Sequence, residues 1–368
     1  MLILLILCGA VSAIVCALLL RYARTHSHRY SLTMPQRFHA GHVPRLGGVA
    51  MMVGCTVGWA WIVIAEPLLK VPNKIHLSPA MGLAWWSVVM VAVAGGVGED
   101  LTHRLTARWR LAFTVVAGLL ASWVLALSIP SLGIAFLEGW WTATPWPGIL
   151  FAVFAVAGLP HAFNLIDGYN GLAGIVALIC CFALAYVSLL AGDRQLAGIV
   201  LVVAGATAGF LLWNYPRGLI FAGDGGAYLW GVTIAVASVL LVQRYPVVSP
   251  WFPILLLIYP VWETLFSIYR KLMRGQSPGV ADALHFHQLI YRRIVRGVFD
   301  DDEARRMLMR NNRTSPYLWG FTLLTVMPAV VFWNNTPMLM GFTALFIVSY
   351  VWSYISIVRF KVPRWLRR

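Results

Sequence analysis

Apolar runs of about 20 residues recur along this 368-residue chain and constrain its fold more than any other feature. A helix needs about 20 mainly apolar residues to cross the hydrocarbon core of a bilayer. Eleven such runs are predicted, centred near residues 11, 55, 90, 118, 155, 181, 204, 233, 262, 325 and 348. Only 11% of the residues are charged. The sequence therefore predicts an all-α, polytopic membrane protein with about 10 to 11 transmembrane helices.

The chain shows no polar linker, internal repeat or soluble terminal domain, so residues 1–368 are predicted to form one integral membrane domain. The apolar N-terminus lacks the basic start of a signal peptide and is expected to be a retained first span. The longest predicted cytoplasmic loop is 270–316, and its DDDEARRMLMR portion is typical of a charged surface helix. All five cysteines lie within predicted spans, which argues against disulfides and zinc.

Basic residues divide unevenly between the two sides of the predicted membrane. With the N-terminus outside and the C-terminus inside, 24 of the 28 Lys and Arg residues fall on the cytoplasmic side. The net charge of +15 is therefore explained mainly by topology, and no nucleic-acid partner is predicted. Membrane lipids and anionic substrates are the partners that such a charge favours.

Acidic residues cluster at the cytoplasmic ends of the predicted spans. Glu99 and Asp100 end the third span, Asp167 follows the fifth, and Asp224 precedes the eighth. Carboxylates from separate turns at one membrane depth are the arrangement that holds a divalent cation against a phosphate. Each acid also has a simpler explanation, because charged residues commonly cap helix ends.

Two further stretches favour phosphate or nucleotide binding. In NLIDGYNGLAG the side chains of Asn164, Asp167 and Asn170 recur at spacing three, and the Asp-Gly and Asn-Gly pairs predict that the helix unwinds. A simple turn between helices is the alternative. In HFHQ, His285 and His287 lie among cations, a setting that suits phosphate better than zinc.

The segment GHVPRLGGVAM opens the second span with cationic or donor groups at the level of the lipid headgroups. Those groups belong to His39, His42 and Arg45. The alternative is a span entrance in which the glycine pair permits a tight helix contact. Glu263 lies inside the ninth predicted span and is interpreted either as a structural partner or as part of a cytoplasmic cavity.

In this order, PRLGG, the acid pair, NLIDGYNGLAG, FAGDGGA and HFHQ resemble the motifs of the polyprenyl-phosphate N-acetylhexosamine-1-phosphate transferases. That family includes the initiating enzymes of O-antigen, enterobacterial common antigen and teichoic acid synthesis, and the peptidoglycan translocase. The resemblance spans most of the chain. It implies that undecaprenyl phosphate attacks a UDP-sugar in the bacterial inner membrane, yielding undecaprenyl-diphospho-sugar and UMP.

The resemblance also implies roles for individual residues. The catalytic positions are Glu99, Asp100 and Asp224, with Asp224 as ligand of Mg²⁺, or of Mn²⁺ as an alternative metal. The positions for the nucleotide and donor diphosphate are Asn164, Asp167, Asn170, His285 and His287. The PRLGG entrance, with His39, His42 and Arg45, is our candidate for binding the lipid phosphate. A homodimer remains open, as does the choice between Glu99 and Asp100 as base.

Three departures from the family pattern indicate which branch of the family the chain resembles. Glu99 stands where the family usually has Asp, Gln288 replaces the last His of HxHH, and Asn170 stands where the peptidoglycan translocase has Asp. The last difference, with PRLGG and the single HxH, favours the O-antigen and common-antigen branch. The identity of the transferred N-acetylhexosamine stays open.

An ion-coupled transporter is the competing hypothesis, because intramembrane acids and broken helices also mark carriers. The acids here lie at the cytoplasmic edge instead of the bilayer midplane, which favours the enzyme. A CDP-alcohol phosphotransferase is disfavoured because its DGxxAR signature is absent: DGYNGL continues differently.

Overall fold

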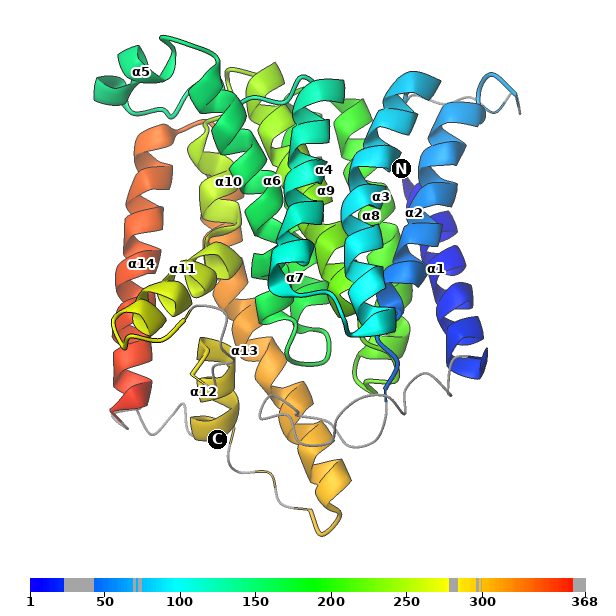
Figure 1. The fold of residues 1–368 in the computed structure, drawn as a ribbon, viewed down its shortest axis with the longest axis vertical. Coiled ribbons are helices and arrows are strands. Elements are labelled where there is room, and N and C mark those ends of the chain that lie inside the picture. The colour runs from blue at the N-terminus through cyan, green and yellow to red at the C-terminus, as the bar shows by residue number, and fades with distance from the viewer. Residues whose placement is uncertain are drawn as a thin grey trace.

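The computed structural model describes residues 1–22, 43–68, 71, 75–277, 284–295, 298 and 300–359. Helices are the only regular elements among these residues, which confirms the all-α prediction (Figure 1). In chain order they are α1 (Leu2–Tyr22), α2 (Gly47–Ile64), α3 (Pro79–Thr102), α4 (Ala107–Val124), α5 (Ala135–Trp141), α6 (Trp146–Ile166), α7 (Leu172–Leu190), α8 (Arg194–Asn214), α9 (Gly223–Arg244), α10 (Trp251–Leu256), α11 (Ile258–Leu272), α12 (Phe286–Arg293), α13 (Glu303–Val331) and α14 (Thr336–Val358).

Within the described ranges, nine helices are long and apolar enough to cross a membrane, so the chain is a multi-pass membrane protein. The other two predicted spans are helical but differ from a continuous apolar span. The helix α4 carries Arg108 and Arg110 in its first turn. The segment near residue 262 is broken at Leu257 between α10 and α11. Pro260 explains the break, because it lacks the N–H that would bond the carbonyl four residues earlier.

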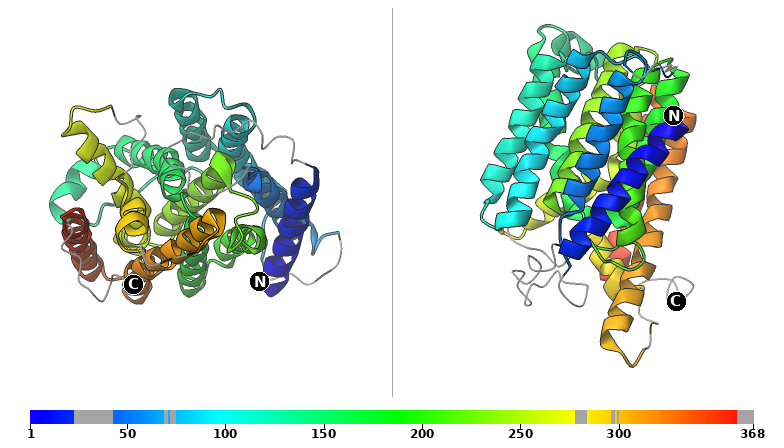
Figure 2. Two further views of the ribbon diagram at one scale, coloured as in Figure 1. Left: turned by 90° about the horizontal axis from the view of Figure 1, so that it is seen from below. Right: turned by 90° about the vertical axis from the view of Figure 1, so that its right-hand side faces the viewer.

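The start of α1 and the end of α14 lie toward opposite ends of the helical bundle (Figures 1 and 2). This arrangement fits an odd number of crossings, while the N-out, C-in orientation stays a prediction from the charge distribution. The helix α13 runs without interruption from Glu303 to Val331, so the charged DDDEARRMLMR portion leads directly into a span. Its first half extends beyond the other helices in Figure 1.

The helix α9 lies at the centre of the bundle and is surrounded by other helices (Figure 2, left). Small residues bring its N-terminal end close to its neighbours, since a Cβ on Gly48 or Gly96 would overlap the backbone of residues 224–226. Membrane helices pack closely at such small residues. These contacts bring the ends of α2, α3 and α9 together.

All five cysteines are buried and unpaired, as expected for apolar filler.

Candidate active site

The start of α2 and the segment before α9 pair through their backbones. The N–H groups of Gly47 and Gly48 donate to the carbonyls of Phe221 and Ala222, both at 2.9 Å. In return the Phe221 N–H donates to the carbonyl of Pro44 at 2.9 Å. PRLGG and FAGDGG therefore form one structural unit, in which the glycines permit the tight contact considered from sequence. Arg45 belongs to this unit; its role toward the lipid phosphate stays a prediction, and His39 and His42 lie outside the described residues.

Asp100, at the last turn of α3, caps the N-terminus of α9. Its side chain is 5% exposed, and its two oxygens accept the N–H groups of Asp224 and Gly225 at 3.0 and 2.9 Å. Negative charge at this end of a helix is favoured because the first N–H groups have no helical partner. Asp100 thus fixes the backbone from which the Asp224 side chain projects.

Asp224 pairs with a cation from a third helix. Nη1 of Arg110 in α4 lies 2.6 Å from Oδ2 of Asp224, and both side chains are largely shielded from solvent. Arg110 is a site residue that the sequence motifs did not single out. Its only sequence signal is its place among three arginines that follow the acid pair.

Glu99 has a different partner from its neighbour Asp100. Its Oε2 accepts the N–H of Leu105 at 2.8 Å, in the turn that connects α3 to α4. Adjacent helical residues point about 100° apart, so the two acids diverge. The structure thus brings Asp100 to α9 and leaves Glu99, half-buried, at the neighbouring turn; its catalytic role stays a prediction.

The NLIDGYNGLAG stretch unwinds between α6 and α7, as expected. Asn170 is 1% exposed and held by α13: its N–H donates to Oδ1 of Asn311 at 2.8 Å, and its carbonyl accepts from Oγ of Ser315 at 2.7 Å. Its Nδ2 donates to Oδ1 of Asn312 at 3.0 Å. Because α6 ends at Ile166, Asn170 does not continue the helical face of Asn164. These bonds anchor the turn.

Asp167 lies in this turn and interacts electrostatically with Asp224 at the N-terminus of α9. Burial raises the pKa of its carboxyl to about 7, Arg45 opposes the rise, and the charge of Asp224 adds to it. The charges of Arg45 and Asp224 thus both act on the Asp167 carboxyl. Asn164, one turn earlier, is half-buried. The turn at 167–171 and the N-terminus of α9 therefore form one polar region.

The HFHQ segment meets the same turn. His287 is 2% exposed, and a Cβ on Gly168 would lie 3.2 Å from its Nε2. Burial lowers the pKa of His287 to about 3 against the opposing charge of Glu263, so its imidazole is neutral. Within the described part of the chain its Nδ1 is buried and has no hydrogen-bond partner. A buried unsatisfied nitrogen of this kind indicates a missing polar partner, such as a ligand.

Glu263 holds the histidine segment in place. Its Oε1 lies 3.3 Å from Nδ1 of His285 and accepts the N–H of Phe286 at 3.0 Å. Its Oε2 accepts the hydroxyl of Tyr350 at 2.7 Å. The rings of His285 and His287 stack with centroids 5.4 Å apart. Glu263 thus has the structural role that was one of its two interpretations.

A second residue without a sequence signal, His161, bridges α4 and α9 one turn away from the Arg110–Asp224 pair. Its Nε2 lies 3.2 Å from Oγ1 of Thr114, and its Nδ1 lies 3.5 Å from the hydroxyl of Tyr228. Thr114 already donates to the Leu111 carbonyl, so His161 must donate to it. Tyr228 then donates to Nδ1. The neutral imidazole thereby connects the two helices that carry Arg110 and Asp224.

The carboxylates are suitable for Mg²⁺ but are not a complete protein cage. No group of three His, Cys, Asp or Glu side chains positioned for a metal occurs in the described ranges. Mg²⁺ is commonly held by one or two carboxylates, with substrate phosphates and water completing the octahedron. Asp224, with Asp100 beside its backbone and Asp167 nearby, fits that donor chemistry.

Known proteins provide an independent comparison. The model of glycosyl transferase family 4 matches residues 82–242, which include the acid pair, the 167–171 turn and Asp224. A probable undecaprenyl-phosphate N-acetylglucosaminyl 1-phosphate transferase of Bacillus subtilis is 29% identical, over 68% of this chain and 66% of the relative.

Two other relatives carry related names. A decaprenyl-phosphate N-acetylglucosaminephosphotransferase of Mycolicibacterium smegmatis is 25% identical, over 96% of this chain and 88% of the relative. A phospho-N-acetylmuramoyl-pentapeptide-transferase of Lactococcus lactis is 31% identical over 50% and 58%. The chain thus spans between about half and most of the length of these relatives. Together with the ordered motifs, the comparisons confirm the resemblance to the polyprenyl-phosphate sugar-1-phosphate transferases, and residues 82–242 match glycosyl transferase family 4.

Proposed function

We propose that this protein transfers N-acetylhexosamine-1-phosphate from a UDP-sugar to undecaprenyl phosphate, initiating O-antigen or a related surface polysaccharide. The site would face the cytoplasm in a bacterial inner membrane. The observation that carries the proposal is that PRLGG, the acid pair and FAGDGGA meet at the N-terminus of α9, where Arg110 pairs with Asp224, while HFHQ contacts the turn at 167–171. The relatives named above are transferases, so the transporter alternative has no support from them.

In the proposed reaction, an oxygen of the lipid phosphate forms a bond to the β-phosphorus of the donor. The bond between that phosphorus and the bridging oxygen breaks, and UMP leaves with the electron pair. Such phosphoryl transfer depends chiefly on positioning and charge neutralisation. Mg²⁺, when bound, would neutralise part of the diphosphate charge.

The residues of the chain have distinct parts in this scheme. Asp224 would hold the metal, and Asp100 sets its position through the backbone of α9. Arg110 keeps the Asp224 carboxylate oriented. His287 supplies a neutral imidazole whose Nε2 lies beside the turn at 167–171 and whose Nδ1 has no hydrogen-bond partner among the described residues, which makes it a suitable partner for the donor diphosphate.

The direct test is a product assay. Membranes that contain the folded protein are incubated with undecaprenyl phosphate, Mg²⁺ and either UDP-GlcNAc or UDP-GalNAc, and both UMP release and lipid-linked product are measured. We expect both products with at least one donor and none after chelation of Mg²⁺. Folded protein that yields no product from a wider panel of UDP-sugars contradicts the proposal. Solute flux in proteoliposomes without lipid product would instead support a transporter.

The Asp167→Asn substitution is expected to remove a pH-dependent cost to stability. Burial raises the pKa of Asp167 from 3.8 to about 7, so the folded protein disfavours the ionised form. The cost is absent below pH 3.8, grows as the pH rises toward 7 and is constant above it. The melting temperature of the variant should therefore exceed that of the wild type by more at pH 8 than at pH 5. An equal difference in melting temperature at both pH values would contradict the raised pKa of Asp167.

The His161→Leu substitution is expected to lower kcat by about 10²-fold in a folded protein, because a small displacement of a catalytic group has an effect of that order. The variant loses the hydrogen bonds that join Thr114 to Tyr228 through His161. Without them the position of Arg110 relative to Asp224 is expected to shift. His161→Gln, which keeps one donor and one acceptor, should recover part of the rate. If the bridge is the cause, His161→Leu and Tyr228→Phe will not be additive. Additive effects would show that the two residues act separately.

A further inference from the structure

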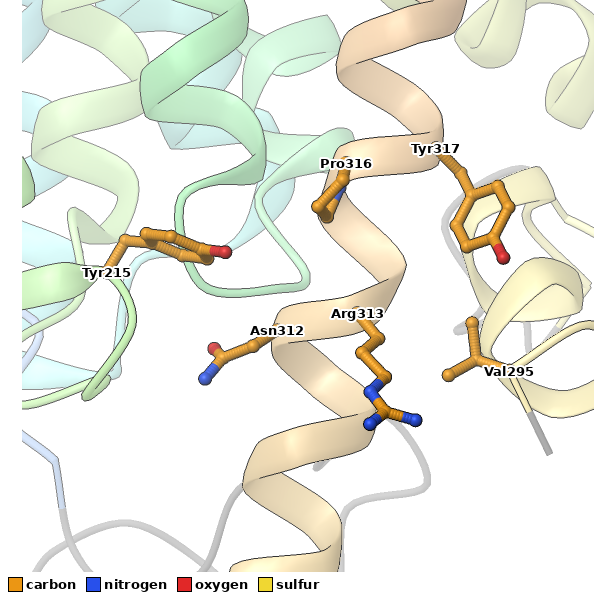
Figure 3. Close-up of a pocket in the computed structure, with 6 residues that line it drawn as sticks. All are labelled: Tyr215, Val295, Asn312, Arg313, Pro316 and Tyr317. Atoms are coloured by element: carbon orange, nitrogen blue, oxygen red, sulfur yellow. The ribbon is translucent and has the colours of Figure 1, made fainter. Parts of the chain in front are cut away.

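The helix α13 presents two different surfaces near the turn at 167–171. On one side, Asn311, Asn312 and Ser315 bind Asn170. On the other, α13 lines a pocket of about 450 Å³, whose walls are drawn in Figure 3 and comprise Tyr215, Val295, Asn312, Arg313, Pro316 and Tyr317. The described residues of the lining include no carboxylate or imidazole, so the pocket differs chemically from the candidate active site.

Arg313 is the charged group of this pocket. It is exposed, and across the described residues it has no ion pair or hydrogen bond. Tyr215 and Tyr317 line the same pocket from opposite sides of α13, each with an apolar ring and a polar hydroxyl (Figure 3). Tyrosine rings of this kind favour the boundary between water and hydrocarbon. An unpaired guanidinium in a pocket with such rings is suited to a phosphate at the level of the lipid headgroups.

The surface of α13 above the pocket is apolar. At helical spacing from Tyr317, the side chains of Leu324, Met327 and Val331 are 72%, 61% and 63% exposed. Between the pocket and these residues lies Gly320, where a Cβ would meet no atom within 4 Å. The surface therefore combines a cationic pocket, an uncovered glycine and an apolar stripe along one helix. Its order matches the headgroup and acyl chain of a phospholipid.

We propose that this surface binds an anionic phospholipid of the cytoplasmic leaflet, with its phosphate on Arg313 and an acyl chain along Leu324, Met327 and Val331. The charge of the headgroup complements the guanidinium, and the chain covers apolar area that the protein leaves exposed. Free phosphate has the same headgroup chemistry but no use for the apolar stripe. The predicted topology, which places Arg313 on the cytoplasmic side, supports this choice of leaflet.

Asn312 connects the lipid pocket to the candidate active site. It lines the pocket, accepts from Nδ2 of Asn170 and donates to the carbonyl of Pro216 at 2.7 Å. A lipid that holds Asn312 in place would also stabilise, through Asn170, the turn that carries Asp167. Bound anionic lipid is therefore expected to increase the rate of transfer, an effect that rests on the proposed function.

The binding test uses the full chain and phosphatidylglycerol as the probe. The purified protein is placed in vesicles of phosphatidylcholine with 20% phosphatidylglycerol, extracted with mild detergent and analysed for retained lipid. Arg313→Gln is expected to lower retained phosphatidylglycerol about fivefold, as for the loss of one cation near a membrane surface. Arg305→Gln is the matched control, because Arg305 is also exposed on α13 but does not line the pocket.

The outcomes separate the alternatives. Equal loss in both variants would overturn the site, because the arginines would then act only as general surface charge. Displacement of the lipid by millimolar inorganic phosphate would overturn the choice of a lipid ligand. Retained phosphatidylglycerol without any transferase activity would refute the proposed function but not the lipid site. Transferase activity that responds to phosphatidylglycerol in the wild type and Arg305→Gln, but not in Arg313→Gln, would support both.

Discussion

Asp224→Asn is expected to reduce turnover by about 10³-fold, an effect typical of removing one preorganised electrostatic group from an active site. The substitution removes the charge that faces Arg110 at 2.6 Å and that would hold the metal. The backbone at this position stays bonded to Asp100, so the local fold should persist. The measurement is UMP release at saturating donor, together with the melting temperature of the purified variant.

Asp193→Asn is the matched control at the opposite end of the bundle. Asp193 forms a comparable ion pair with Arg244 at 3.0 Å and has no part in the candidate site. We expect this variant to lose some stability and to keep near wild-type turnover. Unchanged turnover in Asp224→Asn would remove Asp224 from the site. Equal losses in the two variants would show that the effect reflects a broken ion pair and not catalysis.

Gly223→Ala is expected to lower both the yield of folded protein and its turnover, the latter by at least about tenfold. Gly223 has φ 71°, where a side chain costs roughly 1–2 kcal/mol. Its Cβ would also collide with the backbone carbonyl of Arg45 and lie 2.5 and 2.6 Å from the two carboxylate oxygens of Asp100. The collision would displace the carboxylate that caps α9 and so move Asp224. Size-exclusion profiles, melting temperatures and UMP release would measure the effect.

Gly275→Ala separates the backbone strain from the collision of the Cβ. Gly275 has a similar φ of 66°, but no atom of the described residues lies within 4 Å of the position of its Cβ. This control variant therefore contains the backbone strain without the collision, and near wild-type turnover is expected. If the two variants lose the same activity, the contact with Asp100 has no specific role.

The polar motifs could be recognised from sequence, but most of their partners could not. Asp-Gly and Asn-Gly predict the turn at 167–171 because these pairs disfavour a continued helix. The residues that hold Asn170 come from α13, more than 140 positions later, and carry no local signal. The same holds for Arg110 and His161, because their partners are chosen by helix packing.

The amino-acid sequence by itself determined the all-α membrane fold, since apolar runs of about 20 residues have few other stable environments than a bilayer. It also determined which motifs lie at span ends, because polar groups are excluded from the hydrocarbon core. Only the tertiary structure decided that Asp100 caps α9 while Glu99 turns away, and that Arg110 meets Asp224. Those contacts depend on the close approach of α2, α3 and α9 at glycines, a geometry that arises from packing across the whole chain.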